Sequence, residues 1–153
     1  MDRRNEQLQM AKDFMDAGNY AEASKRLSPL VSARVPEAIF LASTFSSSAD
    51  ETDAQFELRS FHMLQESADL GYVPAMYALA SCYDAGDLTA QDPAMAAEWY
   101  KRAADGGDLR AKFRYGLALS RGVGVQRDRE LGEKLIREAA ESGVEDAMDN
   151  LPH

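Results

Sequence analysis

A segment of 36 residues recurs along the chain, and this repeat constrains the possible folds more than any other feature. Two sets of three small residues mark it with the same spacing: Ala75, Ala111 and Ala147, and Gly71, Gly107 and Gly143. Another copy lies upstream, where residues 35–45 match residues 73–83 at an offset of 38, and its extra length falls in the polar stretch 46–53. A period of this length indicates supersecondary units that stack, because one unit alone cannot bury its apolar side chains.

Within each repeat the apolar residues have the spacing of α-helices. Ala75, Leu79 and Tyr83 recur every four residues, which places them on one side of a helix. The pair Asp92-Pro93 is typical of a helix start, and the recurring glycines are typical of the position just after a helix end. We expect no strands, and helices near 5–16, 20–31, 36–46, 54–70, 74–85, 93–105, 109–121, 129–142 and 145–150.

The residues of the second repeat resemble the Sel1-like repeats (SLR), which are related to tetratricopeptide repeats (TPR). The matching residues are Ala75, Leu79-Ala80, Tyr83, Gly86, Asp92, Ala96, Trp99, Ala103-Ala104 and Gly107. Repeat 109–143 follows the pattern with Gly116 and the loop 122–125, whereas repeat 35–72 lacks the loop glycines and has Phe61 and Leu64 in the tryptophan region. The resemblance implies a non-enzymatic scaffold or adaptor.

These observations together predict an all-α protein of the α-α superhelix class, a right-handed solenoid of antiparallel helix pairs. We expect one domain over 1–153. Its parts would be a TPR-like helix pair at 1–34, three repeats at 35–72, 73–108 and 109–143, and a C-terminal cap at 144–153 that stops at Pro152.

Composition and charge narrow the classes of partner. The chain is 45% hydrophobic and 28% charged, which suits a folded domain. Its net charge of -9 would repel a nucleic-acid backbone. No apolar run is long enough to span a membrane, and the first residues do not resemble a secretion signal, so we expect a cytoplasmic protein.

Few residues offer catalytic or metal-binding chemistry. The histidines are His62 and His153, and Cys82 is the single cysteine, so a zinc site lacks ligands and we predict no cofactor. Cys82 lies in an apolar helix and is expected to be buried and unreactive. Gly122-Val123-Gly124 has neither the strand nor the lysine of a phosphate-binding loop and is interpreted as a turn. Trp99 and Tyr100 occupy positions expected in the core.

One face of the first helix in each repeat is the candidate binding surface. In stacked helix pairs these helices line the concave side. The positions opposite the packed stripe are Ile39, Ser43, Tyr77, Ser81, Asp84, Arg110, Phe113, Leu117 and Arg121. Phe113 and Leu117 are expected to be exposed between the two arginines, as the centre of an interface.

The leading hypothesis is therefore an adaptor or scaffold that binds a partner protein or peptide on its concave face, without a small-molecule substrate. Arginine beside apolar area suits a partner segment with acidic and hydrophobic residues. The alternative is a small immunity or antitoxin-like protein that uses acidic charge against a basic toxin. Separately, Glu37 with Asp50, Glu51 and Asp53 could contact a basic partner, although solvated loop charge is the preferred interpretation. Whether the acidic loop 46–55 or the concave face dominates binding stays open at this point.

Overall fold

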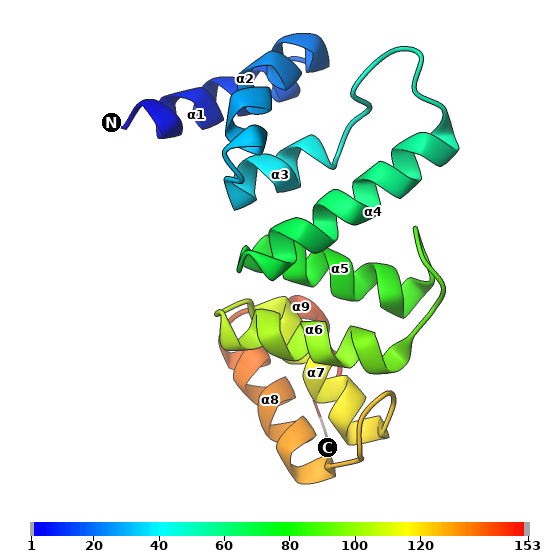
Figure 1. Ribbon diagram of the computed structural model, residues 1–153. Coiled ribbons are helices and arrows are strands. Elements are labelled where there is room, and N and C mark those ends of the chain that lie inside the picture. The colour runs from blue at the N-terminus through cyan, green and yellow to red at the C-terminus, as the bar shows by residue number, and fades with distance from the viewer. Residues whose placement is uncertain (1, 152–153) are drawn as a thin grey trace. The chain divides into compact units, whose positions relative to one another are not determined.

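The computed structural model describes residues 2–151, which contain nine helices and no strand (Figure 1). The helices are α1 (Arg3–Asp16), α2 (Tyr20–Ser32), α3 (Pro36–Ala42), α4 (Asp53–Asp69), α5 (Val73–Ala85), α6 (Pro93–Asp105), α7 (Leu109–Arg121), α8 (Arg129–Glu141) and α9 (Glu145–Met148). Every predicted helix is present, and most boundaries agree within one or two residues. Pro152 and His153 lie outside the described residues. None of the helices between residues 2 and 151 is long and apolar enough to cross a membrane.

The repeated aspartates and glycines begin and end the helices as predicted. The Asp92 carboxylate accepts hydrogen bonds from the first backbone N–H groups of α6, and Asp128 caps α8 in the same way. Each compensates N–H groups that have no partner inside the helix. Gly71, Gly107 and Gly143 follow the second helices with φ of 92°, 98° and 96°, a region that glycine adopts at least cost.

Helix α3 is shorter than predicted and ends at Ala42 instead of continuing to residue 46. The hydroxyls of Ser43 and Thr44 donate to the carbonyls of Phe40 and Leu41, at 2.6 Å and 2.7 Å. The backbone N–H groups of the same two residues donate to the same carbonyls, in a tight last turn. Such local bonds compete with helix continuation. The Ala42 carbonyl accepts a hydrogen bond of 3.1 Å from the Arg59 guanidinium, so a side chain occupies the acceptor that a continuing helix would use.

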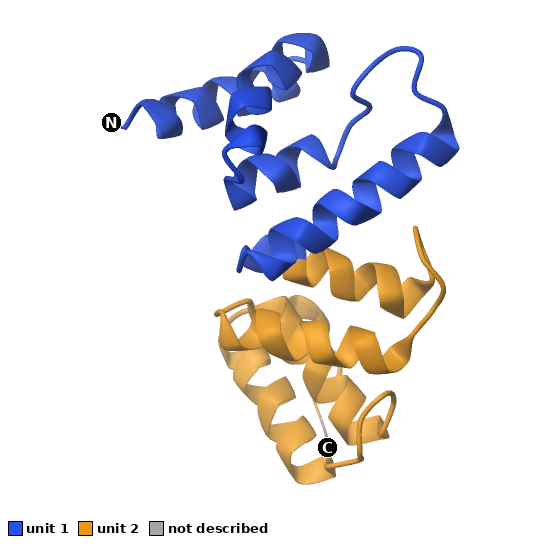
Figure 2. Cartoon of the chain, in the orientation of Figure 1, with its two compact units in different colours: residues 1–75 blue, residues 76–153 orange. Residues whose placement is uncertain are grey.

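The chain divides into two compact units, residues 1–75 and 76–153 (Figure 2). In the first unit, α1 packs on α2, α2 on α3 and α3 on α4. The first three helices and the residues after α3 form a core of Leu8, Ala11, Ala23, Leu27, Val35, Ala38 and Phe45. In the second unit, α6 packs on α7, α7 on α8 and α8 on α9. One cluster of its core consists of Phe113, Ile136, Ala139, Ala140 and Ala147. Trp99 and Tyr100 are buried, which confirms their predicted core positions.

Helices α7 and α8 approach each other backbone to backbone at two glycines. A Cβ atom on Gly116 would lie 2.9 Å from the Gly132 carbonyl oxygen, and one on Gly132 would lie 2.6 Å from the Gly116 carbonyl oxygen. No side chain fits in that space. Both positions therefore require glycine because of the crossing, and this contact fixes the α7–α8 pair that supports the surface described next.

Candidate protein-binding site in the C-terminal unit

Helix α7 has one open stripe, and three arginines occupy it. Arg110, Arg114 and Arg121 are exposed, and Leu117 between them is half-buried. At about 100° per residue, Arg121, Arg114 and Leu117 all lie within about 40° of Arg110 around the helix axis. The four side chains therefore share one side of α7.

Phe113, the predicted centre of the binding surface, is a core residue, and that prediction is wrong. Its side chain is 3% exposed and belongs to the cluster with Ile136, Ala139, Ala140 and Ala147. Phe113 lies about 60° from Arg110 on the side opposite to Arg114, and there α8 covers it. An internal helix of a repeat protein packs against neighbours on both sides, so its buried surface is wider than one apolar stripe.

Ile39 and Ser43, expected on the same kind of face, are also buried. They are 1% and 2% exposed, respectively. Helix α3 lies between α2 and α4, and the Ser43 carbonyl accepts a hydrogen bond of 2.7 Å from the Ser60 hydroxyl on α4. These two residues are thus fixed by the packing of α3 and offer no surface to a partner.

In the C-terminal unit, Arg110 is placed above an aromatic pair. Its guanidinium lies 4.2 Å from the centre of the Tyr77 ring, a cation–π geometry. The Tyr77 ring in turn packs against that of Tyr100 on α6, with 5.7 Å between ring centres. The contact holds a long, exposed arginine in a defined position, so this part of the surface is preorganised.

The Tyr100 hydroxyl joins this aromatic pair to the polar end of α5. It lies 3.3 Å from the Ser81 hydroxyl and donates to an Asp84 carboxylate oxygen, also at 3.3 Å. Burial, and to a lesser extent the negative charge of Asp84, raise the pKa of Tyr100 to about 12. The phenol therefore stays protonated and acts as a hydrogen-bond donor at physiological pH.

An open cavity of about 120 Å³ lies between α6 and α7 beside these groups. We call it the α6–α7 cavity. We call the exposed, charged residues of its lining the rim: Asp84 from α5 with Arg114 and Arg121 from α7. The other lining residues are mainly apolar. The apolar wall residues are Pro93, Ala96, Ala97, Leu117, Ala118 and Val123.

The loop between α7 and α8 closes one side of the α6–α7 cavity with Val123. Gly124 holds this loop against the start of α6: its φ is 71°, and a Cβ atom there would lie 2.0 Å from the Pro93 carbonyl oxygen. Only glycine fits this approach. The segment Gly122-Val123-Gly124 is a turn, as predicted, and it positions an apolar side chain of the cavity wall.

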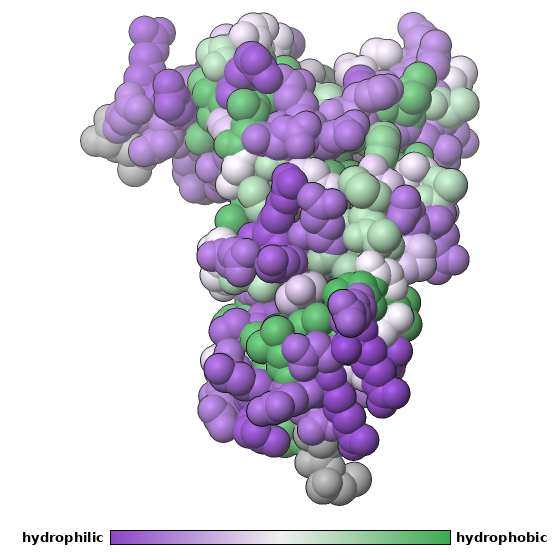
Figure 3. Space-filling view, turned by 60° about the horizontal axis from the view of Figure 1, so that its bottom comes forward, coloured by the Kyte–Doolittle hydropathy of each residue, from purple (hydrophilic) through white to green (hydrophobic). Residues whose placement is uncertain are grey.

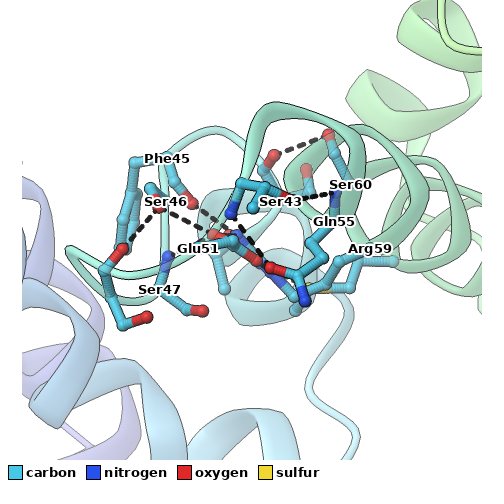
Figure 4. Close-up of polar contacts among 12 residues, drawn as sticks. Ser43, Phe45, Ser46, Ser47, Glu51, Gln55, Arg59 and Ser60 are labelled. Carbon is cyan, nitrogen blue, oxygen red and sulfur yellow. Dashed lines mark hydrogen bonds and ion pairs between the residues drawn. The ribbon is translucent and has the colours of Figure 1, made fainter.

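The acidic loop after α3 is an ordered structural element (Figure 4). The Glu51 carboxylate, whose side chain is 7% exposed, pairs with the Arg59 guanidinium at 2.6 Å and accepts from the Ser46 hydroxyl and the Ser47 N–H. Arg59 also donates to the Phe45 carbonyl at 2.8 Å. These bonds lower the pKa of Glu51 to about 2, with the Arg59 hydrogen bond as the largest cause.

Two of the four acidic residues considered for a basic partner already have a cationic partner within the fold, whereas Asp50 and Asp53 are exposed. Glu51 pairs with Arg59, and Glu37 pairs with Lys12 at 2.6 Å. The charge of each carboxylate is already partly compensated, which weakens its attraction for a basic partner. Cys82 is buried at 9% exposure, and burial raises the pKa of its thiol.

Sequence reasoning missed Tyr100 and Arg114 as members of this surface. Tyr100 was correctly placed in the core, but its hydroxyl reaches the rim of the α6–α7 cavity. A signal for Arg114 was present: Arg110, Arg114, Leu117 and Arg121 have the i, i+4, i+7, i+11 spacing of one helix face. Phe113 took its place in the prediction because aromatic residues and arginines are the types that most often anchor interfaces.

The fold and this surface define a class of protein: helical repeat proteins that present side chains on stacked helix pairs. The Sel1 repeat family model matches residues 73–108 and 109–144. Residues 73–144 therefore form two Sel1-like repeats, and the resemblance to that family and the predicted fold class, the α-α superhelix, are confirmed.

Solved structures support the same assignment. The chain is similar to a Sel1 repeat protein from Oxalobacter formigenes, at 27% identity and a TM-score of 0.73, over 92% of this chain and 97% of that one. It is also similar to c5321, a protective antigen of uropathogenic Escherichia coli with an SLR fold, at 21% identity and a TM-score of 0.78, over 94% of this chain and 32% of that one. Helicobacter pylori cysteine rich protein B matches at 20% identity and a TM-score of 0.60, over 84% and 96%. Among curated proteins, none matches the sequence significantly.

Proposed function

We propose that the protein is a non-enzymatic adaptor that binds a partner protein on the surface formed by α5 and α7. Sel1 repeats are generally protein–protein interaction modules. We define the α5–α7 face by the predicted residues that remain accessible or half-buried: Tyr77, Ser81, Asp84, Arg110, Leu117 and Arg121.

The observation that carries this proposal is the fixed position of Arg110 above Tyr77. Arginine and tyrosine are the residue types that most often anchor interfaces. An arginine already held by an aromatic ring loses less conformational entropy on binding than a free one. The adjacent Arg114 and Arg121 give this part of the surface a positive charge, which suits a partner segment with acidic and hydrophobic residues.

A charge reversal tests the proposal. The partner is first isolated from the native host with the wild-type chain, and its affinity is then measured by calorimetry for Arg110→Glu and for Arg137→Glu. Both arginines are exposed, and Arg137 on α8 lies outside the α5–α7 face. Arg110→Glu is expected to weaken binding by tenfold or more, whereas Arg137→Glu changes it less than twofold. Equal effects of the two variants contradict the assignment of the face.

The toxin-neutralising alternative gives a different result in the same assay. A basic partner held by acidic loop residues binds independently of Arg110 and loses affinity when the exposed Asp50 and Asp53 are replaced by Asn. No contact in the described residues favours this alternative, since Glu37 and Glu51 already have cationic partners.

A further inference from the structure

The α6–α7 cavity is an unfilled recess next to the α5–α7 face. Its walls are apolar and part of its rim is cationic, and no segment of the described chain fills it. Figure 3 brings the C-terminal unit forward and shows green hydrophobic patches there, bordered by purple hydrophilic side chains. An apolar recess with a polar rim has the general form of a binding pocket for one side chain.

We propose that the α6–α7 cavity receives one branched aliphatic side chain from a linear segment of the partner, and that Arg121 and Arg114 pair with an acidic residue next to it. This inference rests on the proposed function, because it names what the surface recognises. It extends the site to residues of α6 and of the α7–α8 loop that lie outside the α5–α7 face.

Size supports an aliphatic occupant. The cavity holds about 120 Å³, and apolar cavities of about 150 Å³ accept a molecule as large as benzene. Valine, leucine or isoleucine therefore fits within this volume, whereas the ring systems of tyrosine and tryptophan exceed it and would protrude into solvent. The walls that Ala97 and Ala118 form cannot retreat, since both belong to packed helices.

Charge supports the acidic neighbour. Within residues 2–151, the guanidinium groups of Arg114 and Arg121 take part in no ion pair with a carboxylate. The one carboxylate on the rim, Asp84, already accepts the Tyr100 hydroxyl hydrogen bond. Two cations thus face solvent beside an apolar recess, and a carboxylate from the partner can pair with either in bidentate form.

The experiment uses a phage-displayed library of random nine-residue peptides, selected on the full chain. The expected consensus is Val, Leu or Ile adjacent to Asp or Glu. A synthetic consensus peptide is then titrated by fluorescence anisotropy against the wild type, Arg121→Glu and Ala118→Leu, with Arg137→Glu as the matched charge control. Arg121→Glu and Ala118→Leu are each expected to weaken binding at least tenfold, the second because leucine fills the α6–α7 cavity.

Two peptide changes make the test specific. Tryptophan in place of the aliphatic residue is expected to weaken binding at least tenfold. A lysine in place of the acidic residue is expected to lose binding to the wild type and regain it with Arg121→Glu. If melting curves show that Ala118→Leu does not fold, the charge swap alone tests the inference.

The outcomes separate this inference from the proposed function. If the peptide is insensitive to Arg121→Glu and Ala118→Leu but loses affinity with Arg110→Glu, the α5–α7 face stands and the role of the cavity is refuted. If none of the three variants affects binding, both are refuted. A selection that enriches no peptide also contradicts the inference, because a linear segment is what it requires.

Discussion

At the scale of single residues, Phe113 shows how helical periodicity can mislead. The sequence spacing places it about 60° from Arg110, and direction around a helix says nothing about which neighbours cover that side. Arg110 and Arg121 are exposed as predicted, whereas Leu117 is half-buried and packs against the core cluster of α7 and α8. Phe113 is buried, since α8 reaches further around α7 than one apolar stripe indicated.

The burial of Phe113 gives a stability prediction. Phe113→Ala should lower the free energy of unfolding by about 3–5 kcal/mol, because it removes a large buried ring and leaves a cavity. Arg110→Ala at an exposed position should change it by less than about 1 kcal/mol. Urea denaturation followed by circular dichroism measures both. Equal stability of Phe113→Ala and the wild type would show that Phe113 is a surface residue.

Cys82 yields a second residue-scale prediction. Its thiol is buried and burial raises its pKa, so little reactive thiolate forms at neutral pH. A thiol reagent at pH 7 should label the native protein at least tenfold more slowly than the protein unfolded in about 6 M guanidinium chloride, a concentration that unfolds most domains. Equal rates in the two conditions would show that Cys82 is accessible.

At the scale of helices and loops, the local signals were the most predictive. The bounds of α6 and α7 agree with the prediction because their starts and ends depend on residues within one turn, such as Asp92 and Gly107. The end of α3 depends on Arg59, which lies 17 residues after the Ala42 carbonyl that it binds. A sequence pattern read locally carries no trace of that bond, so α3 was predicted too long.

The ion pair of Glu51 with Arg59 predicts a specific pH dependence. The pKa of Glu51 is about 2 in the fold and rises to its ordinary value of 4.5 in the unfolded chain. The carboxylate therefore stabilises the fold fully above pH 4.5, and this contribution is lost as the pH falls from 4.5 towards 2. Melting temperatures of Glu51→Gln and wild type should converge over that interval. Glu57→Gln, at an exposed position of α4, should keep the wild-type profile.

Gly124 tests how tightly the α7–α8 loop is held. Gly124→Ala should destabilise the protein by more than Gly18→Ala, although both glycines have nearly the same φ, 71° and 72°. The Gly18 change adds only left-handed strain of about 1–2 kcal/mol. The Gly124 change adds a clash with the Pro93 carbonyl as well. Equal losses in thermal denaturation would mean that the loop moves freely away from α6.

At the scale of the whole molecule, stability should vary along the chain. Helix α9 has four residues and packs mainly on α8, whereas α7 packs extensively on both α6 and α8. Hydrogen exchange followed by mass spectrometry should show faster exchange in residues 145–151 than in 109–121, because terminal elements open with the least free energy. Equal protection of the two segments would indicate that α9 and α7 open in a single step.

The close crossing of Gly116 and Gly132 has a consequence for how this chain can vary in length over evolution. One residue inserted into α7 or α8 would turn the following part of that helix by about 100° and carry its glycine away from the crossing. The α7–α8 loop resists insertion too, since Gly124 lies against Pro93. We expect length changes to be tolerated better in the α3–α4 loop, where residues 47–50 are exposed and pack against no other helix backbone at a glycine. The two extra residues of the first repeat also lie in the α3–α4 loop.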